Sequence, residues 1–278
     1  MRIKPVSPLI AILYFLACNT SASTESPADP IIEDTIVLRK NDSGVRTIHV
    51  FVALCDNKYQ GIVPVPASLG NGQDENKNLY WGAGFGVKTF FTRKTTMWKL
   101  VSSFPSPEKY IRERLLFKHV SKNVYLLADA YDGQFIQQAT IDFLKASAGD
   151  GHLTIKNENK EIYFGGASNL ITYTGHDGLM DFSLSQTFKA KNNSKRETII
   201  LACYSKKFFS PHLRSTGATP LLWSTGLMAP EAYILHDAVN EWINNSSAAQ
   251  VRTAGAKAYA RYQHCTTSAA MRLLVTGW

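Results

Sequence analysis

The chain has 278 residues, of which 45% are hydrophobic and 19% are charged, and its formal net charge is +8. This composition excludes an intrinsically disordered chain and supplies enough apolar side chains for one large domain or two small ones. The basic residues are scattered, which favours solvated faces or contacts with acidic surfaces over a nucleic-acid groove, so we expect no nucleic-acid partner.

Residues 1–17 are typical of a signal for export. Arg2 and Lys4 precede an apolar segment over residues 8–17 that is too short to cross a bilayer as a helix. This segment ends in Phe-Leu-Ala-Cys, which resembles a bacterial lipobox with an unusual Phe at its first position. The resemblance implies cleavage before Cys18 and a lipid on its sulfur. Cleavage near residues 21–23 is the alternative, and both alternatives predict an exported protein.

The export signal bears on where the mature protein is found, and the rest of the chain divides into two predicted regions. The mature protein is expected to be periplasmic, membrane-anchored through Cys18 as a lipoprotein, or secreted. Residues 18–33 are rich in Ser, Thr, Pro and Asp, which predicts a flexible tether. Residues 34–278 are predicted to form a single domain.

The chain contains four cysteines, at Cys18, Cys55, Cys203 and Cys265. If Cys18 is lipidated or removed, three remain, and at least one of them is unpaired within a monomer. An unpaired thiol in an oxidising compartment indicates a reactive cysteine. A disulfide between Cys55 and Cys265 stays open. No Cys and His pair has the spacing of a zinc finger, so we expect no metal.

The first predicted strands cover residues 34–40 and 46–55. The second is almost entirely apolar, as expected for a central strand that is covered on both faces, and it ends in the polar pair Asp56 and Asn57. Residues 61–78 are rich in Pro, Gly, Asn and Asp and predict a long loop.

Closely spaced glycines open the stretch 79–100, which continues with apolar residues at the spacing of a helix. The glycines, between Gly82 and Gly86, match neither of the common phosphate-binding patterns. We therefore favour close packing through small residues, with nucleotide binding as a third functional hypothesis. Residues 74–78 carry calcium-type ligands without the full loop pattern and predict a turn.

The middle of the chain predicts a helix over 109–119, a buried strand over 123–130 and an amphipathic helix over 134–146. A polar segment over 149–160 follows.

Two apolar runs then each end in a reactive side chain. Residues 170–174 lead into Gly-His176-Asp-Gly, and residues 197–202 lead into Cys203. Both runs are rich in β-branched residues, which predicts buried parallel strands. Because sites in open α/β sheets lie outside the carboxyl ends of the strands, neighbouring strands would bring His176 and Cys203 together as a base and a nucleophile. The alternative is a turn histidine and a small buried cysteine.

The remainder predicts a loop over 210–219, a strand over 220–226, helices over 229–244 and 248–262, and a short tail over 273–275. Pro230 is expected in the first turn of the first of these helices. The order of elements indicates an α/β fold with a mainly parallel sheet flanked by helices.

The two strand ends resemble those of the clan CD cysteine peptidases, which include caspases, legumains, gingipains, separases and bacterial relatives. In this family an apolar strand ends in His-Gly and a later apolar strand ends in Ala-Cys. Weaker likeness extends to residues 50–57 and 221–232. The resemblance implies a caspase-like fold and an exported cysteine hydrolase, a peptidase acting on peptide or protein substrates without a cofactor.

By this resemblance, Cys203 is the nucleophile, His176 is the acid and base, and the amide of Gly178 helps to bind the oxyanion. Asp56 or Asn57 is expected to orient His176, with Asp177 as an alternative. Thr225 is a candidate for substrate binding by its position alone. The competing hypothesis is a catalytically inactive surface or periplasmic binding module on the same fold, in which His176 and Cys203 only end strands.

Overall fold

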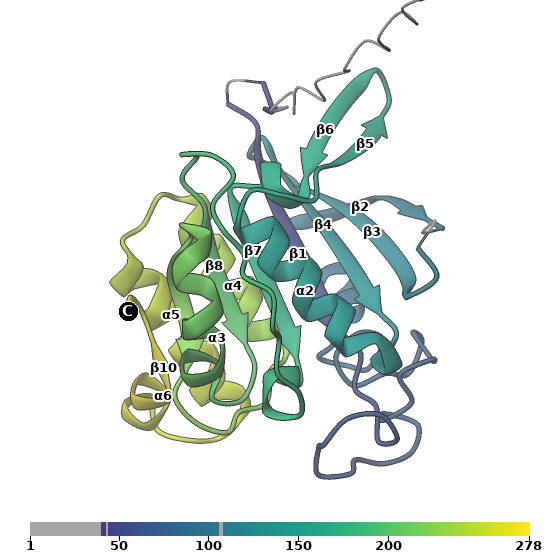
Figure 1. The fold of residues 1–278 in the computed structure, drawn as a ribbon, viewed down its shortest axis with the longest axis vertical. Helices are drawn as coiled ribbons and strands as arrows, with labels where there is room; N and C mark the ends of the chain where they lie inside the picture. The colour runs from purple at the N-terminus through teal and green to yellow at the C-terminus, as the bar shows by residue number, and fades with distance from the viewer. Residues whose placement is uncertain (1–39, 43, 106–107) are drawn as a thin grey trace, which may run out of the picture. The chain divides into compact units, whose positions relative to one another are not determined.

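A mixed β-sheet is the centre of the structure, which is a computed structural model that describes residues 40–42, 44–105 and 108–278. In the described part of the chain the large sheet has eight strands in the order β10-β9-β8-β7-β1-β4-β3-β2 (Figure 1). Five neighbouring strands are parallel: β4 (Val124–Tyr131), β1 (Arg46–Ala53), β7 (Leu170–Gly175), β8 (Glu197–Leu201) and β9 (Thr219–Ser224). The fold is therefore α/β with a mainly parallel sheet flanked by helices, as predicted.

Antiparallel strands complete the sheet at both edges. β3 (Ile111–His119) pairs with β4, and β2 (Trp98–Phe104) pairs with β3. At the other edge, β10 (Leu274–Val275) pairs with β9. A separate hairpin consists of β5 (Leu153–Asn157) and β6 (Lys160–Phe164).

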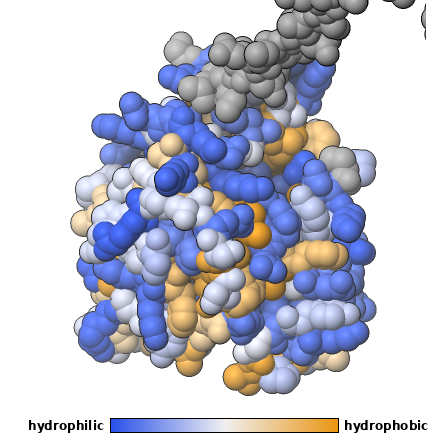
Figure 2. All heavy atoms as spheres, viewed as in Figure 1, coloured by the Kyte–Doolittle hydropathy of each residue, from blue (hydrophilic) through white to orange (hydrophobic). Residues whose placement is uncertain are grey.

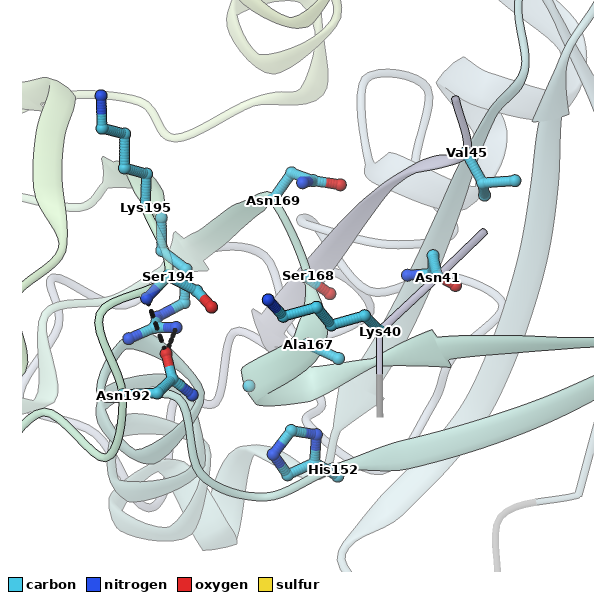
Figure 3. Close-up of a pocket in the computed structure, with 12 residues that line it drawn as sticks. Lys40, Asn41, Val45, His152, Ala167, Ser168, Asn169, Asn192, Ser194 and Lys195 are labelled. Carbon is cyan, nitrogen blue, oxygen red and sulfur yellow. Dashed lines mark hydrogen bonds between the residues drawn. The ribbon is translucent and has the colours of Figure 1, made fainter. Parts of the chain in front are cut away.

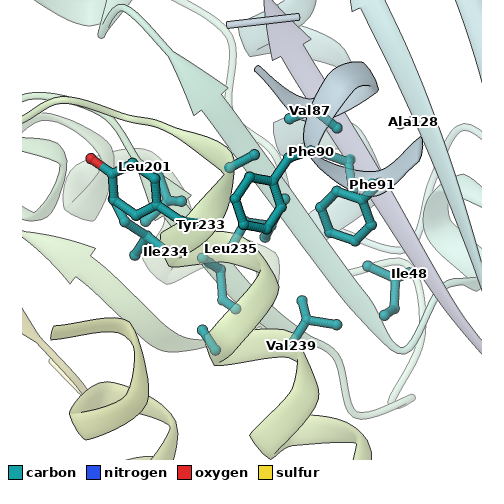
Figure 4. Close-up of a cluster of buried hydrophobic side chains, with 14 of the residues drawn as sticks. Ile48, Val87, Phe90, Phe91, Ala128, Leu201, Tyr233, Ile234, Leu235 and Val239 are labelled. Carbon is teal, nitrogen blue, oxygen red and sulfur yellow. The ribbon is translucent and has the colours of Figure 1, made fainter. Parts of the chain in front are cut away.

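Both faces of the sheet are covered, because successive side chains of a strand point to opposite faces. Phe51 of β1 lies in the cluster that contains Phe143 of α2 (Ile136–Ser147) and Phe209 of α3 (Ser205–Leu213). Ile48 and Val50 of the same strand lie in a second cluster, which contains residues of α4 (Ala232–Ile243) and α5 (Ala248–Tyr262). Figure 4 shows this second cluster, with the α4 side chains facing those of the sheet.

Shorter helical segments connect these elements. They are α1 (Val87–Thr89), η1 (Phe90–Lys94), η2 (Gly133–Phe135), η3 (Gly165–Ala167), η4 (Gly178–Met180), η5 (Arg214–Thr216) and α6 (Thr267–Leu273). The face of the molecule seen in Figure 2 is mainly hydrophilic, with smaller apolar areas between the polar ones.

The prediction of a helix over 109–119 was wrong, because this stretch is strand β3. Leu115, Leu116 and Phe117 are all buried, and β3 pairs with β2 on one side and β4 on the other. The helix predicted over 79–100 is confined to α1 and η1, and β2 begins at Trp98.

The loop predicted over 210–219 was also wrong, since α3 runs to Leu213 and η5 follows it. Pro211 signals a break, yet the structure accommodates it inside α3. Pro230 precedes α4, whose N-cap is Glu231, so it does not lie in the first turn. The tail over 273–275 is the end of α6 followed by strand β10, and the segment 149–160 contains β5.

The strand predicted over 34–40 lies outside the described residues, apart from Lys40, which is not in a strand. The predicted signal, the tether and Cys18 also lie outside them.

Candidate functional site

His176 and Cys203 lie at the same end of the sheet, just beyond the carboxyl ends of two paired strands. Thr174 of β7 pairs with Leu201 of β8 in parallel register, and each reactive residue comes two positions after its paired residue. The structure therefore brings both to the carboxyl end of neighbouring strands. His176 is 6% exposed and Cys203 is partly buried.

An aspartate that the sequence did not single out binds the imidazole of His176. The Nε2 atom of His176 lies 2.7 Å from Oδ2 of Asp181, and the Tyr173 hydroxyl donates a hydrogen bond of 2.8 Å to the His176 carbonyl. The same Asp181 oxygen accepts a hydrogen bond from the Gly61 N–H at 2.9 Å. These contacts fix the position of the ring and leave its Nδ1 atom without a recorded partner in the described part of the chain.

The turn η4 explains why Asp181 reaches back to His176. Asp177 is the N-cap of this turn, and its Oδ1 accepts the Leu179 N–H at 3.0 Å. The Asp181 N–H in turn donates to the Gly178 carbonyl at 2.9 Å, which closes the turn. Residues 177–181 therefore form one tight turn. In the sequence, Asp177 is a typical N-cap residue and marks the start of this turn.

Asp56 and Asn57, which were expected to orient His176, instead organise the long loop after β1. Oδ1 of Asp56 accepts the N–H groups of Lys58 and Tyr59 at 2.8 and 3.1 Å, and its Oδ2 accepts the Gln73 amide. Asn57 exchanges two hydrogen bonds with the backbone of Val65. Both side chains are occupied in holding the loop, so the prediction that one of them orients His176 was wrong.

The thiol of Cys203 is held by the backbone of Met228. The Met228 N–H donates to Sγ at 3.4 Å, and the thiol donates to the Met228 carbonyl at 3.5 Å. Burial raises the pKa of the thiol, the Met228 N–H partly offsets this rise, and the Asp177 carboxylate raises the pKa further. Cys203 is therefore a protonated thiol at neutral pH in this state.

The chain turns sharply directly after Cys203. Tyr204 has φ 49° and ψ 28°, a left-handed conformation that is uncommon outside glycine, and α3 begins at the next residue. Ser205 and Ser224 hold this turn, because the Ser205 N–H donates to the Ser224 hydroxyl at 3.1 Å and the Ser224 hydroxyl donates to the Ala202 carbonyl. The turn presents Cys203 between the end of β8 and the start of α3.

Asp177 carries a buried carboxylate oxygen without a partner. Its side chain is fully buried, and within the described residues no hydrogen bond reaches its Oδ2 atom. Burial raises the pKa of Asp177 to about 7, the Leu179 N–H opposes this rise, and Asp181 adds to it. The alternative prediction that Asp177 orients His176 is not supported, because Asp181 occupies that position.

Two backbone N–H groups near the reactive side chains have no acceptor in the described residues. No hydrogen bond donated by the N–H of Gly178 or of Cys203 is recorded in the part of the chain that the structure describes. A side chain at Gly178 would be impossible without rearrangement, since a Cβ atom there would lie 2.7 Å from the Phe182 ring. Free N–H groups of this kind stabilise negative charge that develops on an oxygen.

The Thr225 hydroxyl, a predicted candidate for substrate binding, is hydrogen-bonded to the backbone of α6. It donates to the carbonyls of Arg272 and Leu273 at 3.0 and 3.1 Å and so joins the end of β9 to the end of α6. The structure does not bring this hydroxyl into contact with His176 or Cys203 in the described residues.

The other chemical signals of the sequence have structural explanations. Cys55, Cys203 and Cys265 are free, with Cys55 buried and Cys265 exposed, so the described residues hold no Cys55–Cys265 disulfide. Gly82 and Gly86 lie against backbone atoms of Asn76 and Trp81, where a Cβ atom would come within 2.2 and 2.4 Å. They allow close packing, as predicted, although against turns rather than between a helix and the sheet.

The residues that the structure describes contain no group of three or more His, Cys, Asp or Glu side chains arranged to hold a metal ion. Within the same residues, none of the helices has both the length and the apolar character needed to cross a membrane.

Comparisons of the chain with protein-family models, with curated proteins and with solved structures found no match.

Proposed function

We propose that the protein is an exported, caspase-like cysteine hydrolase that cleaves peptide bonds with His176 and Cys203. The observation that carries this proposal is the register of β7 and β8, which brings both residues to the carboxyl ends of neighbouring strands, near two N–H groups without an acceptor in the described residues. The cysteine follows a strand and precedes a helix, and the histidine is oriented by Asp181. A nucleophile, a base and a group that orients the base are the parts that acyl transfer requires.

In the proposed reaction, the Cys203 sulfur attacks the carbonyl carbon of the scissile peptide bond. The N–H groups of Gly178 and Cys203 stabilise the resulting oxyanion. The thiol proton passes to His176 and then to the leaving amine, whose departure leaves a thioester on Cys203. Water then attacks this thioester with His176 as the base, which releases the carboxylic acid and returns the proton to sulfur.

Asp181 supports this cycle through His176. Its carboxylate binds Nε2 at 2.7 Å, so the imidazole keeps its proton on that atom and offers Nδ1 as the base. When Nδ1 takes the thiol proton, the carboxylate stabilises the imidazolium that forms. Asp181 is therefore a positioning residue for the reaction.

The second candidate is the inactive binding module, and the state of Cys203 favours it. The raised pKa of the thiol and its contacts with Met228 are those of a structural cysteine. In the hydrolase, substrate binding has to release the thiol from Met228 and bring it to His176. In the binding module no such rearrangement occurs.

A peptide-library digest of the full-length chain separates the two candidates. We expect the wild-type protein to cleave a subset of peptides at one type of bond, and Cys203→Ala to lose this activity by at least about a thousandfold. His176→Ala should lose a comparable amount. Cys265→Ser is the matched control, because it removes an exposed thiol in the connection between α5 and α6 and should leave cleavage unchanged.

Absence of cleavage by well-folded wild-type protein, judged by circular dichroism, would contradict the hydrolase and leave the binding module. Cleavage that survives in Cys203→Ala would assign the activity to another site or to a contaminant.

The proposed export and the lipidation of Cys18 depend on residues outside the described part. Mass spectrometry of the protein produced in a bacterial host tests them. A mature chain that begins at Cys18 with added lipid mass supports the lipoprotein, and cleavage near residue 22 supports a periplasmic or secreted protein.

A further inference from the structure

A cavity of about 320 Å³ lies at the amino ends of the parallel strands, whereas His176 and Cys203 lie beyond their carboxyl ends (Figure 3). Its lining residues precede the strands: Val45 comes before β1, Ser168 and Asn169 before β7, and Arg196 before β8. The cavity is therefore remote from the proposed reaction and is not part of that site.

The charged groups that line this cavity are all basic. Lys40, Lys195 and Arg196 carry positive charge, and no aspartate or glutamate is among the described residues of the lining. In Figure 3 the Lys40 side chain extends across the cavity and the His152 ring lies on the other side of the lining, whereas Lys195 extends away. The remaining polar groups are amides and hydroxyls, which bind oxyanions as donors.

Arg196 is the strongest sign that a ligand belongs here. It is only 2% exposed, and its recorded hydrogen bonds are both to neutral acceptors, the Ser147 carbonyl at 3.0 Å and Oδ1 of Asn192 at 2.7 Å. Burial is the single cause that acts on the Arg196 pKa, and it lowers this pKa. No carboxylate of the described residues compensates the charge.

The contrast with Arg114 shows how unusual this is within the same chain. Arg114 is also buried, and its guanidinium forms two hydrogen bonds with Asp129 at 2.6 and 2.7 Å. A buried charge without a partner is costly, and proteins normally pair it or use it for binding. Arg196 has at least two N–H groups beyond those in its recorded hydrogen bonds.

A buried hydroxyl in the same lining also lacks a partner. Ser168 is 2% exposed, and its Oγ atom makes no hydrogen bond within the described residues. Buried hydroxyls are normally paired, so an unpaired one in the same lining as an uncompensated guanidinium points to a missing acceptor.

We propose that this cavity binds an oxyanion of the phosphate or sulfate type, as a free anion or as the head group of an acidic lipid. Arg196 provides the buried charge, Lys40 closes over the anion, and Ser168 donates its hydroxyl. A tetrahedral oxyanion supplies the acceptors that these donors lack, and an arginine binds it through parallel hydrogen bonds. This proposal does not depend on the proposed hydrolase.

Isothermal titration calorimetry of the full-length protein with inorganic sulfate and with inorganic phosphate tests the site. Ionic strength is held constant with sodium chloride. We expect saturable binding of one anion per chain, weakened about tenfold in Arg196→Gln, since hydrogen bonds to charged groups contribute on this scale. Lys40→Gln, which alters an exposed side chain and should fold normally, is expected to weaken binding about threefold.

Lys99→Gln is the matched control, because it removes the same charge from an exposed position on β2 and lines no described part of this cavity. Binding by Lys99→Gln should equal that of the wild type. Absence of saturable binding by the wild type, or equal weakening in Lys40→Gln and Lys99→Gln, would overturn the proposal.

Sedimentation with vesicles distinguishes the two sources of the anion. Binding to phosphatidylglycerol vesicles but not to phosphatidylcholine vesicles, with competition by millimolar phosphate, supports a lipid head group. Calorimetric binding of phosphate without sedimentation supports a free anion. Vesicle binding that Arg196→Gln retains in full would show that other basic residues attract the membrane, and would overturn the lipid form.

Discussion

The two ends of the parallel strands each hold a buried ionisable side chain that no opposite charge compensates in the described structure. Asp177 lies at the carboxyl edge beside Cys203, with one carboxylate oxygen unpaired in the described structure. Arg196 lies at the amino edge in the basic cavity, with neutral acceptors only. Since an uncompensated buried charge reduces stability, the fold tolerates one at each of the two places where we propose chemistry or binding.

The middle of the sheet shows the opposite arrangement. Asp129 of β4 accepts two hydrogen bonds from Arg114 of β3, and its Oδ2 lies 3.0 Å from Nε2 of His49 on β1. Burial tends to raise the pKa of Asp129, but Arg114 and His49 outweigh it and hold this pKa below its ordinary value. The Gly165 N–H donates to His49 Nδ1 at 3.1 Å, so both ring nitrogens of His49 have partners. The ion pair of Arg114 and Asp129 and the His49 hydrogen bond join three strands and stabilise the fold.

The largest effect on stability is expected in this matched network. Asp129→Ala leaves Arg114 buried without its carboxylate, and we expect a loss of about 3–5 kcal/mol in the free energy of unfolding. Urea denaturation followed by circular dichroism measures it. A loss below about 1 kcal/mol would show that the network contributes no more than an exposed ion pair.

Asp177→Asn should instead increase the free energy of unfolding. The amide retains the N-cap hydrogen bond to Leu179 but removes a buried carboxylate whose pKa is about 7, against 3.8 for the ordinary group. Because the fold favours the protonated acid, its contribution to stability is full below about pH 4 and is lost as the pH rises through 7. We expect the variant to exceed the wild type in free energy of unfolding by about 4 kcal/mol at pH 8 and to match it near pH 4. Equal pH profiles of unfolding for the two proteins would contradict the assignment.

Replacing each of the two buried arginines by Met compares an arginine that is paired with a carboxylate with one that is not. Arg114→Met leaves the Asp129 carboxylate buried without its arginine, so we expect the same loss in the free energy of unfolding as for Asp129→Ala. Arg196→Met removes an uncompensated charge together with two hydrogen bonds to neutral groups, so a net loss of about 1 kcal/mol is expected. Thermal unfolding without added phosphate compares them, and equal losses would remove the distinction.

The smallest effect concerns the reactivity of Cys203. In a Cys265→Ser background, iodoacetamide should alkylate Cys203 slowly at neutral pH, because burial and Asp177 raise its pKa. Adding Asp177→Asn should increase the rate at pH 8 by about threefold, and by less at pH 6, where the wild-type carboxyl is largely protonated. Rates that do not change with Asp177→Asn at either pH would show that its charge does not reach the thiol.

The strands that carry His176 and Cys203 were predictable from the sequence because each is a continuous apolar run with a polar end. The prediction failed for β3, whose Arg114 is polar by type but buried by its pairing with Asp129, a residue from the next strand. No local pattern records such a partner. Asp181 was missed for a similar reason, since only the closed turn η4 brings it to His176. Arg196 ends a polar stretch without periodicity, and its burial is visible only in three dimensions.

Covalent labelling of the full-length protein tests the central claim most directly. The wild type and His176→Ala are incubated with a library of peptidyl acyloxymethyl ketones, and intact-mass spectrometry locates the adduct. The hydrolase predicts rapid modification of Cys203 by a subset of the peptides, loss of that modification in His176→Ala, and no modification of the exposed Cys265 at the same rate. Modification of Cys203 at the same slow rate in both proteins, whatever the peptide, would contradict the account.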